Sequence, residues 1–169
     1  MPDAITLADA PPSARFILRA RPAAMEAAAG PLGTRLPVVA CRSAVADDLA
    51  ALWLGPDEWL LLSSDGAAVA AGLATALAGL PHALVDVSHR QEGLVLSGRH
   101  AAAVLHAGCP LDLHPDAFPI GMCTRTLLGK AEIMLWRTGA ERFRIEAMRS
   151  FVPYVRQYLA EAAREFVAA

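Results

Sequence analysis

The sequence predicts an α+β fold in which antiparallel sheets carry helices packed on one side. Two observations lead to this prediction. Short β-rich runs separated by turn residues occur in pairs along the chain, and helix-like segments follow the pairs. The chain has 169 residues, which is long enough to bury a core without disulfide or metal support. We expect a flexible N-terminal arm over residues 1–14, which contain three prolines, and a single domain over residues 15–169.

The first half of the chain contains the clearest local element, a β-hairpin over residues 51–64. Two β-rich runs flank a Gly-Pro-Asp-Glu turn, in which Pro56 presets the backbone dihedral. Ser64 or Asp65 can cap the helix that follows, and Pro81 closes it. The other elements expected in this half are a strand at 14–20, a connector of uncertain structure at 21–33, a strand at 35–41 and a strand at 83–88.

The second half is expected to alternate strands with two helices. A strand at 92–98 precedes a short helix over 99–107, which Gly108 stops. Residues 123–139 and 141–148 supply two or three further strands. The last helix begins near Ser150, because its apolar residues follow i, i+3, i+4 spacing. These residues are Val152, Val155, Leu159, Ala162 and Phe166.

Charge and composition argue against several classes of protein. The net charge is −2 and the basic residues are scattered, so we expect no nucleic-acid binding. Residues 66–85 carry no charged side chain, but they are mostly Ala and Gly and include Pro81, so we expect no membrane span. Neither of the glycine-rich phosphate-binding motifs, G-x-G-x-x-G and G-x-x-x-x-G-K-[ST], occurs in the sequence. The first residues do not have the pattern of a secretory signal. Three cysteines without paired spacing indicate a reduced, cytoplasmic setting.

The stretch GCPLDLHPDAFPIGMC, residues 108–123, raises the question of a metal site. His106 and Cys109 can share a face near a helix end, and His114 or Cys123 would have to complete the ligand set. Structural zinc sites normally combine two closely spaced ligand pairs, and a second tight pair is missing here. We therefore interpret the cysteines as packed thiols and the stretch as a rigid connection from a helix to the next strand.

Asp86, Ser88 and His89 have the composition of a hydrolase triad. On a strand, however, Asp86 and Ser88 point to one face and His89 to the other, whereas a triad must converge in space. The sequence also lacks the G-x-S-x-G motif that exposes a nucleophilic serine. We interpret this group as a polar cluster at a strand end that binds neighbouring backbone.

Other acid–base and thiol sites are not indicated either. Asp57 and Glu58 are close in sequence, but a solvated turn is a poor setting for a general acid. Cys109 follows the C-terminal end of a helix, which is the wrong end for activating a thiolate. We therefore predict no catalytic, cofactor-binding or metal-binding residue in this chain.

Tryptophan and arginine are the remaining residues of note. Trp53, Trp59 and Trp136 lie on predicted strands, where tryptophan usually belongs to the core. Tryptophan and arginine are also the residues that interfaces favour as anchors. A chain that is rich in them, without a catalytic set of its own, indicates a binding or subunit role. The basic residues concerned are Arg90, Arg125, Lys130, Arg137, Arg144 and Arg149.

Four segments together resemble the gamma subunit of bacterial heterotetrameric sarcosine oxidase. They are LGPDEWLLL (54–62), VDVSHRQEGLVLSG (85–98), GCPLDLHPDAFPIGMCTRTLLGKAEIMLWR (108–137) and FRIEAMRSFVPYVRQYL (143–159). The resemblance runs in order over about residues 50–160, and the first forty residues match less clearly. GCPLDL followed by FP-x-G-x-C-x-RT and K-A-x-x-x-LW is its most specific part.

The resemblance implies a small subunit of a four-chain flavoenzyme that oxidatively demethylates sarcosine to glycine and passes the one-carbon unit to tetrahydrofolate. In that family the flavins, NAD and folate belong to the alpha and beta subunits and zinc belongs to delta, so this chain would hold no cofactor. Its expected partners are the alpha, beta and delta subunits, with the large alpha subunit foremost. The implied fold is similar to the folate-binding domain of the glycine-cleavage T-protein and other aminomethyltransferases.

The resemblance carries no catalytic residue onto this chain. The matched polar residues are instead candidates for structural contacts or for the interface with the larger subunits: Asp57, Glu58, Trp59, Asp86, His89, Arg90, Gln91, Arg125 and Arg149. Two other functions stay open, a standalone folate-binding domain of the aminomethyltransferase type and a metal-dependent enzyme. The sequence also leaves open whether the complex acts on sarcosine or on another N-methyl amino acid.

Overall fold

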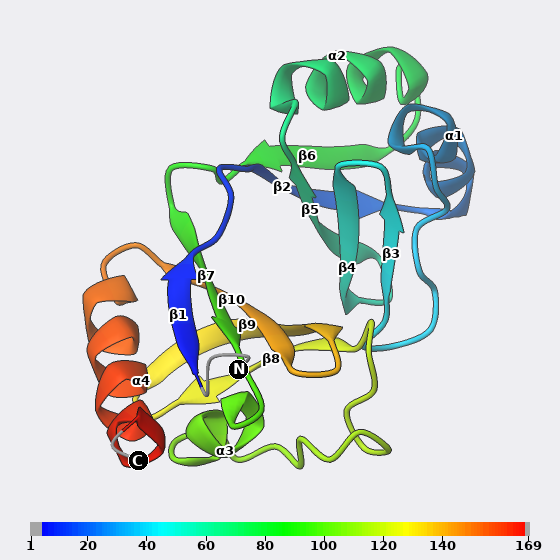
Figure 1. The fold of residues 1–169 in the computed structure, drawn as a ribbon. Coiled ribbons are helices and arrows are strands. Elements are labelled where there is room, and N and C mark those ends of the chain that lie inside the picture. The colour runs from blue at the N-terminus through cyan, green and yellow to red at the C-terminus, as the bar shows by residue number, and fades with distance from the viewer. Residues whose placement is uncertain (1–4, 168–169) are drawn as a thin grey trace. The chain divides into compact units, whose positions relative to one another are not determined.

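The computed structural model describes residues 5–167 and divides them between two compact units. One unit comprises residues 12–89, and the other combines residues 5–11 with residues 90–167. Each unit contains a five-stranded antiparallel sheet with helices packed on one face (Figure 1). The predicted α+β class is confirmed.

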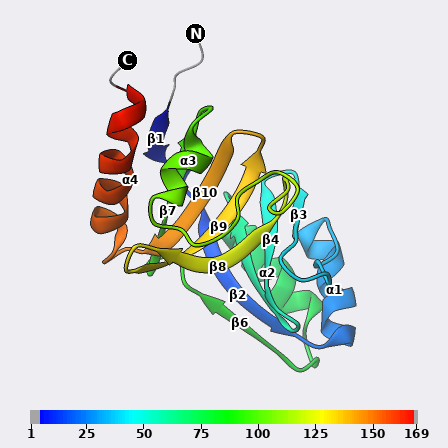
Figure 2. The same ribbon diagram turned by 90° about the horizontal axis from the view of Figure 1, so that it is seen from below.

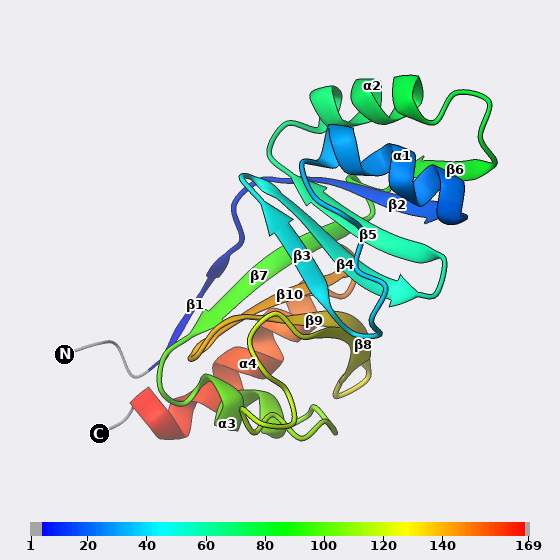
Figure 3. The same ribbon diagram turned by 90° about the vertical axis from the view of Figure 1, so that its right-hand side faces the viewer.

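In the unit of residues 12–89, helices α1 (Pro22–Leu32) and α2 (Gly66–Ala76) lie side by side over the sheet (Figure 3). Alternate strand residues face the helices, because successive side chains of a strand point to opposite faces. Leu18 and Leu61 thus pack with Leu73 of α2 in one apolar core. The strands, in their order across the sheet, are β3 (Ser43–Ala46), β4 (Leu49–Gly55), β5 (Glu58–Ser63), β2 (Ala14–Ala20) and β6 (His82–Asp86).

In the other unit, helices α3 (Ala101–His106) and α4 (Val152–Val167) lie on the same side of the sheet (Figure 2). Val155 and Leu159 of α4 pack with Phe143 and Leu96 of the sheet, and all four side chains are fully buried. The strands, in their order across the sheet, are β1 (Thr6–Asp9), β7 (Gln91–Ser97), β10 (Arg142–Met148), β9 (Ala131–Gly139) and β8 (Cys123–Leu128).

Two local predictions are confirmed in detail. The hairpin of β4 and β5 pairs Trp53 with Trp59 across the predicted turn. Asp65 caps α2, because its Oδ1 accepts a hydrogen bond of 3.0 Å from the backbone N–H of Ala68. Both features depend on residues that are close in sequence.

The structure corrects the expectation of a flexible N-terminal arm over residues 1–14. Thr6–Asp9 form β1, which pairs antiparallel with β7 so that Leu7 lies opposite Leu96. Leu7 packs against the apolar core, and strand β2 already begins at Ala14. Residues 1–4 lie outside the described part of the chain. The single domain expected over residues 15–169 is divided at residue 90 into the two compact units.

Two elements between residues 21 and 46 also differ from expectation. The connector expected at 21–33 is helix α1, which buries Ala24, Ala28 and Leu32 in the core. The strand expected at 35–41 is not formed, and the strand that pairs with β4 is Ser43–Ala46 instead. Cys41 has a positive φ of 59°, which interrupts the extended chain just before β3.

Candidate functional site

The hairpin turn positions three of the predicted polar residues. Asp57 is exposed in the turn, and Glu58 accepts a hydrogen bond of 2.8 Å from Arg19 Nη2. This bond and the negative charge of Glu58 raise the pKa of Arg19 above its usual value. Trp59 is fully buried, and its indole N–H donates to the Pro37 carbonyl at 2.8 Å. These contacts join β5 to β2 and to the segment before β3.

Asp86 and Ser88 form a small network at the end of β6. The Oδ1 atom of Asp86 accepts a bond of 2.8 Å from the backbone N–H of Ser88, and Ser88 Oγ accepts one of 2.9 Å from the N–H of Arg15. Hydrogen bonds from the side chain and backbone of Ser88 lower the pKa of Asp86. The hydroxyl of Ser88 is therefore bound to backbone, as the sequence predicts for a polar cluster at a strand end. His89 is exposed beside this network.

Three further predicted residues meet in the unit that contains α4. The backbone N–H of Arg149 donates to the Arg90 carbonyl at 2.9 Å, and Gln91 lies opposite Met148 in the register of β7 and β10. Arg90 and Arg149 are exposed. Arg125 is exposed on β8, two strand positions across the sheet from β10. The structure thus brings Arg90, Gln91 and Arg149 together.

The connection between α3 and β8 is fastened by Arg137 of β9. Its Nη1 atom donates to the carbonyls of Leu113 and Phe118, at 3.1 and 2.9 Å. Its Nη2 and Nε atoms donate to the carbonyls of Ala140 at 2.5 Å and Gly139 at 3.4 Å. Only 4% of Arg137 is exposed. One buried guanidinium therefore ties the connection to the turn that follows β9, and its rigid fork of donors suits this task.

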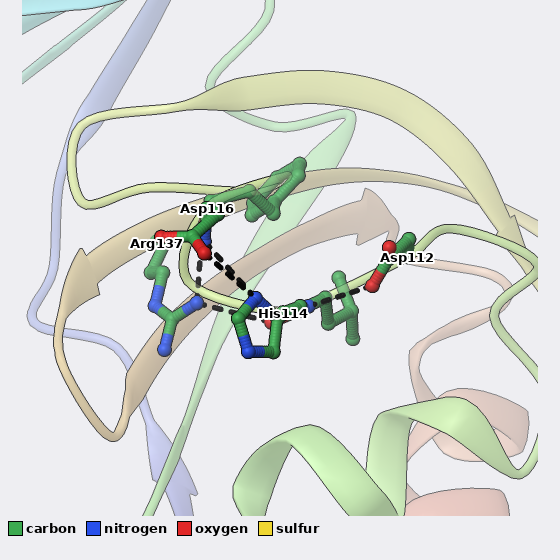
Figure 4. A network of polar contacts seen from close by, with 6 residues as sticks. Asp112, His114, Asp116 and Arg137 are labelled. Atoms are coloured by element: carbon green, nitrogen blue, oxygen red, sulfur yellow. Dashed lines mark hydrogen bonds and ion pairs between the residues drawn. The ribbon is translucent and has the colours of Figure 1, made fainter.

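Short polar contacts shape the same connection (Figure 4). The backbone N–H of His114 donates to Asp112 Oδ1 at 2.9 Å. The backbone N–H of Asp116 donates to His114 Nδ1 at 3.4 Å, and the Asp116 carboxylate lies 3.5 Å from that nitrogen. Contacts between a side chain and the backbone two residues further on are typical of turns. They fix the path of the backbone through the connection.

The start of the connection is held from α4 by Tyr158. Its hydroxyl donates to the Ala107 carbonyl at 2.7 Å. A Cβ atom on Gly108 would lie 2.7 Å from the Tyr158 ring, so only glycine fits at this position without a shift. The Gly108 carbonyl accepts a bond of 2.9 Å from the N–H of Gly129, in the turn between β8 and β9.

The cysteines and histidines of this region do not converge. Cys109 and Cys123 are buried and are not disulfide-bonded, and Cys109 Sγ lies 3.9 Å from Thr126 Oγ1. His106 and His114 are exposed. Within residues 5–167, no group of three or more His, Cys, Asp or Glu side chains is placed to hold a metal ion.

A pocket of about 500 Å³ opens beside the connection. Its lining includes Arg137 and Phe143, with the guanidinium carbon 5.1 Å from the centre of the Phe143 ring. Two arginines and two carboxylates lie around it, so its lining combines both signs of charge. The ionisable residues that line it are Arg99, His106, Asp112, His114, Arg137 and Glu141.

The fastening role of Arg137 was not predicted from the sequence. The signal was present, because Ile133, Leu135 and Arg137 occupy alternate positions of one strand and therefore point to the same face. Ile133 and Leu135 are core residues, which places the Arg137 side chain on the buried face. Three of the four carbonyls that accept from it come from loops and the fourth, that of Gly139, ends β9, so the set could not be inferred from spacing.

None of the helices in the described residues is long and apolar enough to cross a bilayer. The uncharged run at 66–85 is divided between α2 and β6, which is the division expected from its composition.

Comparison with known proteins identifies the family. A model described as the sarcosine oxidase, gamma subunit family matches residues 18–165. The chain is 39% identical over 136 residues to sarcosine oxidase subunit gamma of Corynebacterium sp. (strain P-1), which covers 80% of this chain and 67% of that protein. It is 37% identical over 169 residues to sarcosine oxidase subunit gamma of Corynebacterium sp. (strain U-96), covering 98% and 82% of the two chains.

Solved structures agree with this result. A chain of the heterotetrameric sarcosine oxidase from Corynebacterium sp. U-96 superposes with a TM-score of 0.92 at 36% identity, covering 98% of this chain and 86% of that chain. The glycine cleavage system aminomethyltransferase T from Bartonella henselae superposes with a TM-score of 0.69 at 19% identity, covering 92% and 45%. The second likeness concerns the fold alone and confirms the predicted aminomethyltransferase-like architecture. The family match and the two relatives show that the chain belongs to the sarcosine oxidase gamma subunit family.

Proposed function

We propose that this chain is a non-catalytic assembly subunit of a heterotetrameric sarcosine oxidase. The observation that carries the proposal is its superposition, at 36% identity and over 98% of its length, on a chain of the heterotetrameric enzyme from Corynebacterium sp. U-96. A fold preserved at this level over nearly the whole chain supports an equivalent place in an equivalent complex. The complex would convert sarcosine to glycine and transfer the one-carbon unit to tetrahydrofolate.

The polar contacts described above support a structural role for this chain. Ser88 Oγ accepts from the N–H of Arg15, Arg137 donates to four carbonyls, and Asp112 accepts from the N–H of His114. Each of these side chains holds backbone in place. The flavins, NAD, folate and zinc would accordingly be held by the alpha, beta and delta subunits, with the large alpha subunit as the main partner and the cytoplasm as the site of the complex.

The predicted polar residues that lie on the surface are proposed as contacts with those partners. Glu58 and Trp59 make structural contacts within their own unit, and Gln91 lies at the start of β7. The exposed members of the predicted set are Asp57, Asp86, His89, Arg90, Arg125 and Arg149.

Co-expression tests the proposal. The affinity-tagged chain is produced with the alpha, beta and delta chains and, separately, alone. We expect the three other chains to co-purify with it, together with flavin absorbance and sarcosine oxidation, and we expect the isolated chain to show neither. Recovery of the tagged chain without its partners, or sarcosine oxidation by the isolated chain, would overturn the proposal. Parallel assays with other N-methyl amino acids identify the substrate of the complex.

The alternative is a standalone folate-binding function, which the aminomethyltransferase-like fold suggests. That likeness extends to the fold alone. Calorimetric titration of the isolated chain with tetrahydrofolate separates the two functions. Saturable binding would favour the alternative, and heats equal to those of dilution would favour the assembly role. Elemental analysis of the same sample tests the metal-dependent enzyme, which requires a stoichiometric metal.

A further inference from the structure

Three large apolar side chains are exposed next to one another where β10 passes into α4. The exposed fractions are 46% for Met148, 43% for Phe151 and 38% for Tyr154. A turn brings them together, because the N–H of Phe151 donates to the Met148 carbonyl at 2.8 Å and helix α4 begins immediately afterwards. We call Met148, Phe151 and Tyr154 the junction patch. Large apolar side chains grouped on a surface mark interaction sites more often than single ones do.

The side chains of the junction patch are not part of the apolar core of their own unit. Val152, Val155 and Leu159 form the buried stripe of α4, at the spacing expected for one helix face. Phe151 immediately precedes Val152, and Tyr154 immediately precedes Val155. Their side chains therefore point away from the buried stripe. On the following turns the exposed residues include Gln157, Ala160 and Glu161, and none of the described ones is a large apolar side chain. Exposure of large apolar side chains is thus confined to the start of α4.

The side chain of Tyr154 is positioned by contacts within this chain. Its hydroxyl accepts a hydrogen bond of 3.1 Å from the N–H of Lys130, and its ring lies against Gly129 in the turn between β8 and β9. Tyrosine loses little conformational freedom on binding, and a side chain that is already ordered loses less. The patch therefore has a preorganised aromatic anchor.

The surroundings of the patch are mostly cationic, with one acidic neighbour, Glu132. Glu132 and Met148 follow Ile133 and Ala147 in the antiparallel register of β9 and β10 and therefore lie beside each other. Residues 148–155, MRSFVPYV, contain an arginine and no acidic residue. The bond from the N–H of Arg149 to the Arg90 carbonyl brings a second exposed arginine to the border, and Lys130 adjoins Tyr154. Methionine, aromatic residues and arginine are the types enriched at protein interfaces, and charged groups at the rim are matched by opposite charges on the partner.

We propose that the junction patch docks another subunit of the complex, one that presents an apolar pocket edged by carboxylates. The proposal rests on the proposed function and names the surface through which the chain assembles. A second copy of this chain is a poorer occupant, because two copies related by a two-fold axis would bring their arginines together.

Variants of the whole chain, co-expressed with the alpha, beta and delta chains, test the proposal. Phe151→Ser removes the apolar centre and Arg149→Glu reverses the charge at the border. Ile120→Ser is the matched control, since Ile120 is 61% exposed in the connection between α3 and β8 of the same unit. The backbone N–H of the adjacent Gly121 donates to the Arg137 carbonyl, toward the end of β9 that is distant from the patch. We expect F151S and R149E each to lower the amount of partner chains recovered by about tenfold or more, as for a central interface residue, and I120S to leave it within about twofold.

The outcomes separate this proposal from the proposed function. If the unmodified chain recovers no partner, both the proposed function and the proposed docking surface are wrong. If the unmodified chain and both variants recover partners equally, the assembly role stands and the docking surface is wrong. Thermal unfolding of each isolated variant verifies its fold, and R149E keeps the test decisive if F151S lowers the unfolding midpoint. Sedimentation of the isolated chain as a dimer that F151S converts to a monomer would assign the patch to a second copy and overturn the proposal.

Discussion

Arg137 donates a hydrogen bond of 2.9 Å to the carbonyl of Phe118, although the two residues are 19 positions apart. The bond joins β9 to a connection without regular secondary structure, which would otherwise leave buried carbonyls without donors. Burial of a carbonyl is tolerated only when it is hydrogen-bonded. The stretch that resembles a metal site in sequence is therefore ordered by an arginine from outside it.

Replacement of Arg137 by lysine tests this role. Lysine keeps the charge but has no planar fork, so it leaves several of the four carbonyls without a donor. We expect R137K to lower the free energy of unfolding by about 2 to 4 kcal/mol, measured by urea denaturation. Arg99→Lys is the control, because Arg99 lines the same pocket but is exposed, and we expect a change within about 0.5 kcal/mol. Equal effects of the two substitutions would contradict the fastening role of Arg137.

Gly108 and Tyr158 are predicted to be coupled. A methyl group at Gly108 would meet the Tyr158 ring at 2.7 Å and disturb the bond from the tyrosine hydroxyl to Ala107. We expect G108A to lower the free energy of unfolding by about 1 to 3 kcal/mol, as overpacking does elsewhere. In a Y158A background the same substitution should have a much smaller effect. Equal effects in both backgrounds would show that the tyrosine is not the cause.

Asp86 is predicted to make stability depend on pH. Hydrogen bonds from Ser88 lower the pKa of Asp86 in the folded chain below its ordinary value of 3.8. The ionised carboxylate therefore stabilises the folded state above the ordinary value, and this contribution disappears as the pH falls through the lowered pKa. D86N should be less stable than the unmodified chain at pH 7 and should approach it at acidic pH. A difference in unfolding free energy that stays constant between these conditions would contradict the prediction.

Elements that depend on neighbouring residues could be predicted from the sequence. The hairpin of β4 and β5 follows from the Pro56 turn, and α2 begins where Asp65 can cap it. The apolar spacing of α4 fixed its buried face, although Ala163 rather than Ala162 completes the stripe. These features require no knowledge of distant contacts.

Elements that depend on distant residues could not be predicted. β1 exists because Thr6–Asp9 pair with β7, and four residues alone carry no such signal. Helix α1 is stabilised by burying small alanines against the sheet, which spacing alone does not distinguish from a connector. The same limit applies to the site. The sequence identified Arg90 and Arg149 as polar residues of interest, but only the register of β7 and β10 places them side by side.

The proposed function makes this chain one of four different subunits of a sarcosine-oxidising complex. The native mass of that complex, purified through a tag on the alpha subunit after co-expression of all four chains, tests this assignment. We predict a mass that includes one copy of this 17.8 kDa chain with each of the other three. A fully active complex of the other three chains, with this chain absent although it is expressed and soluble, would contradict the assignment.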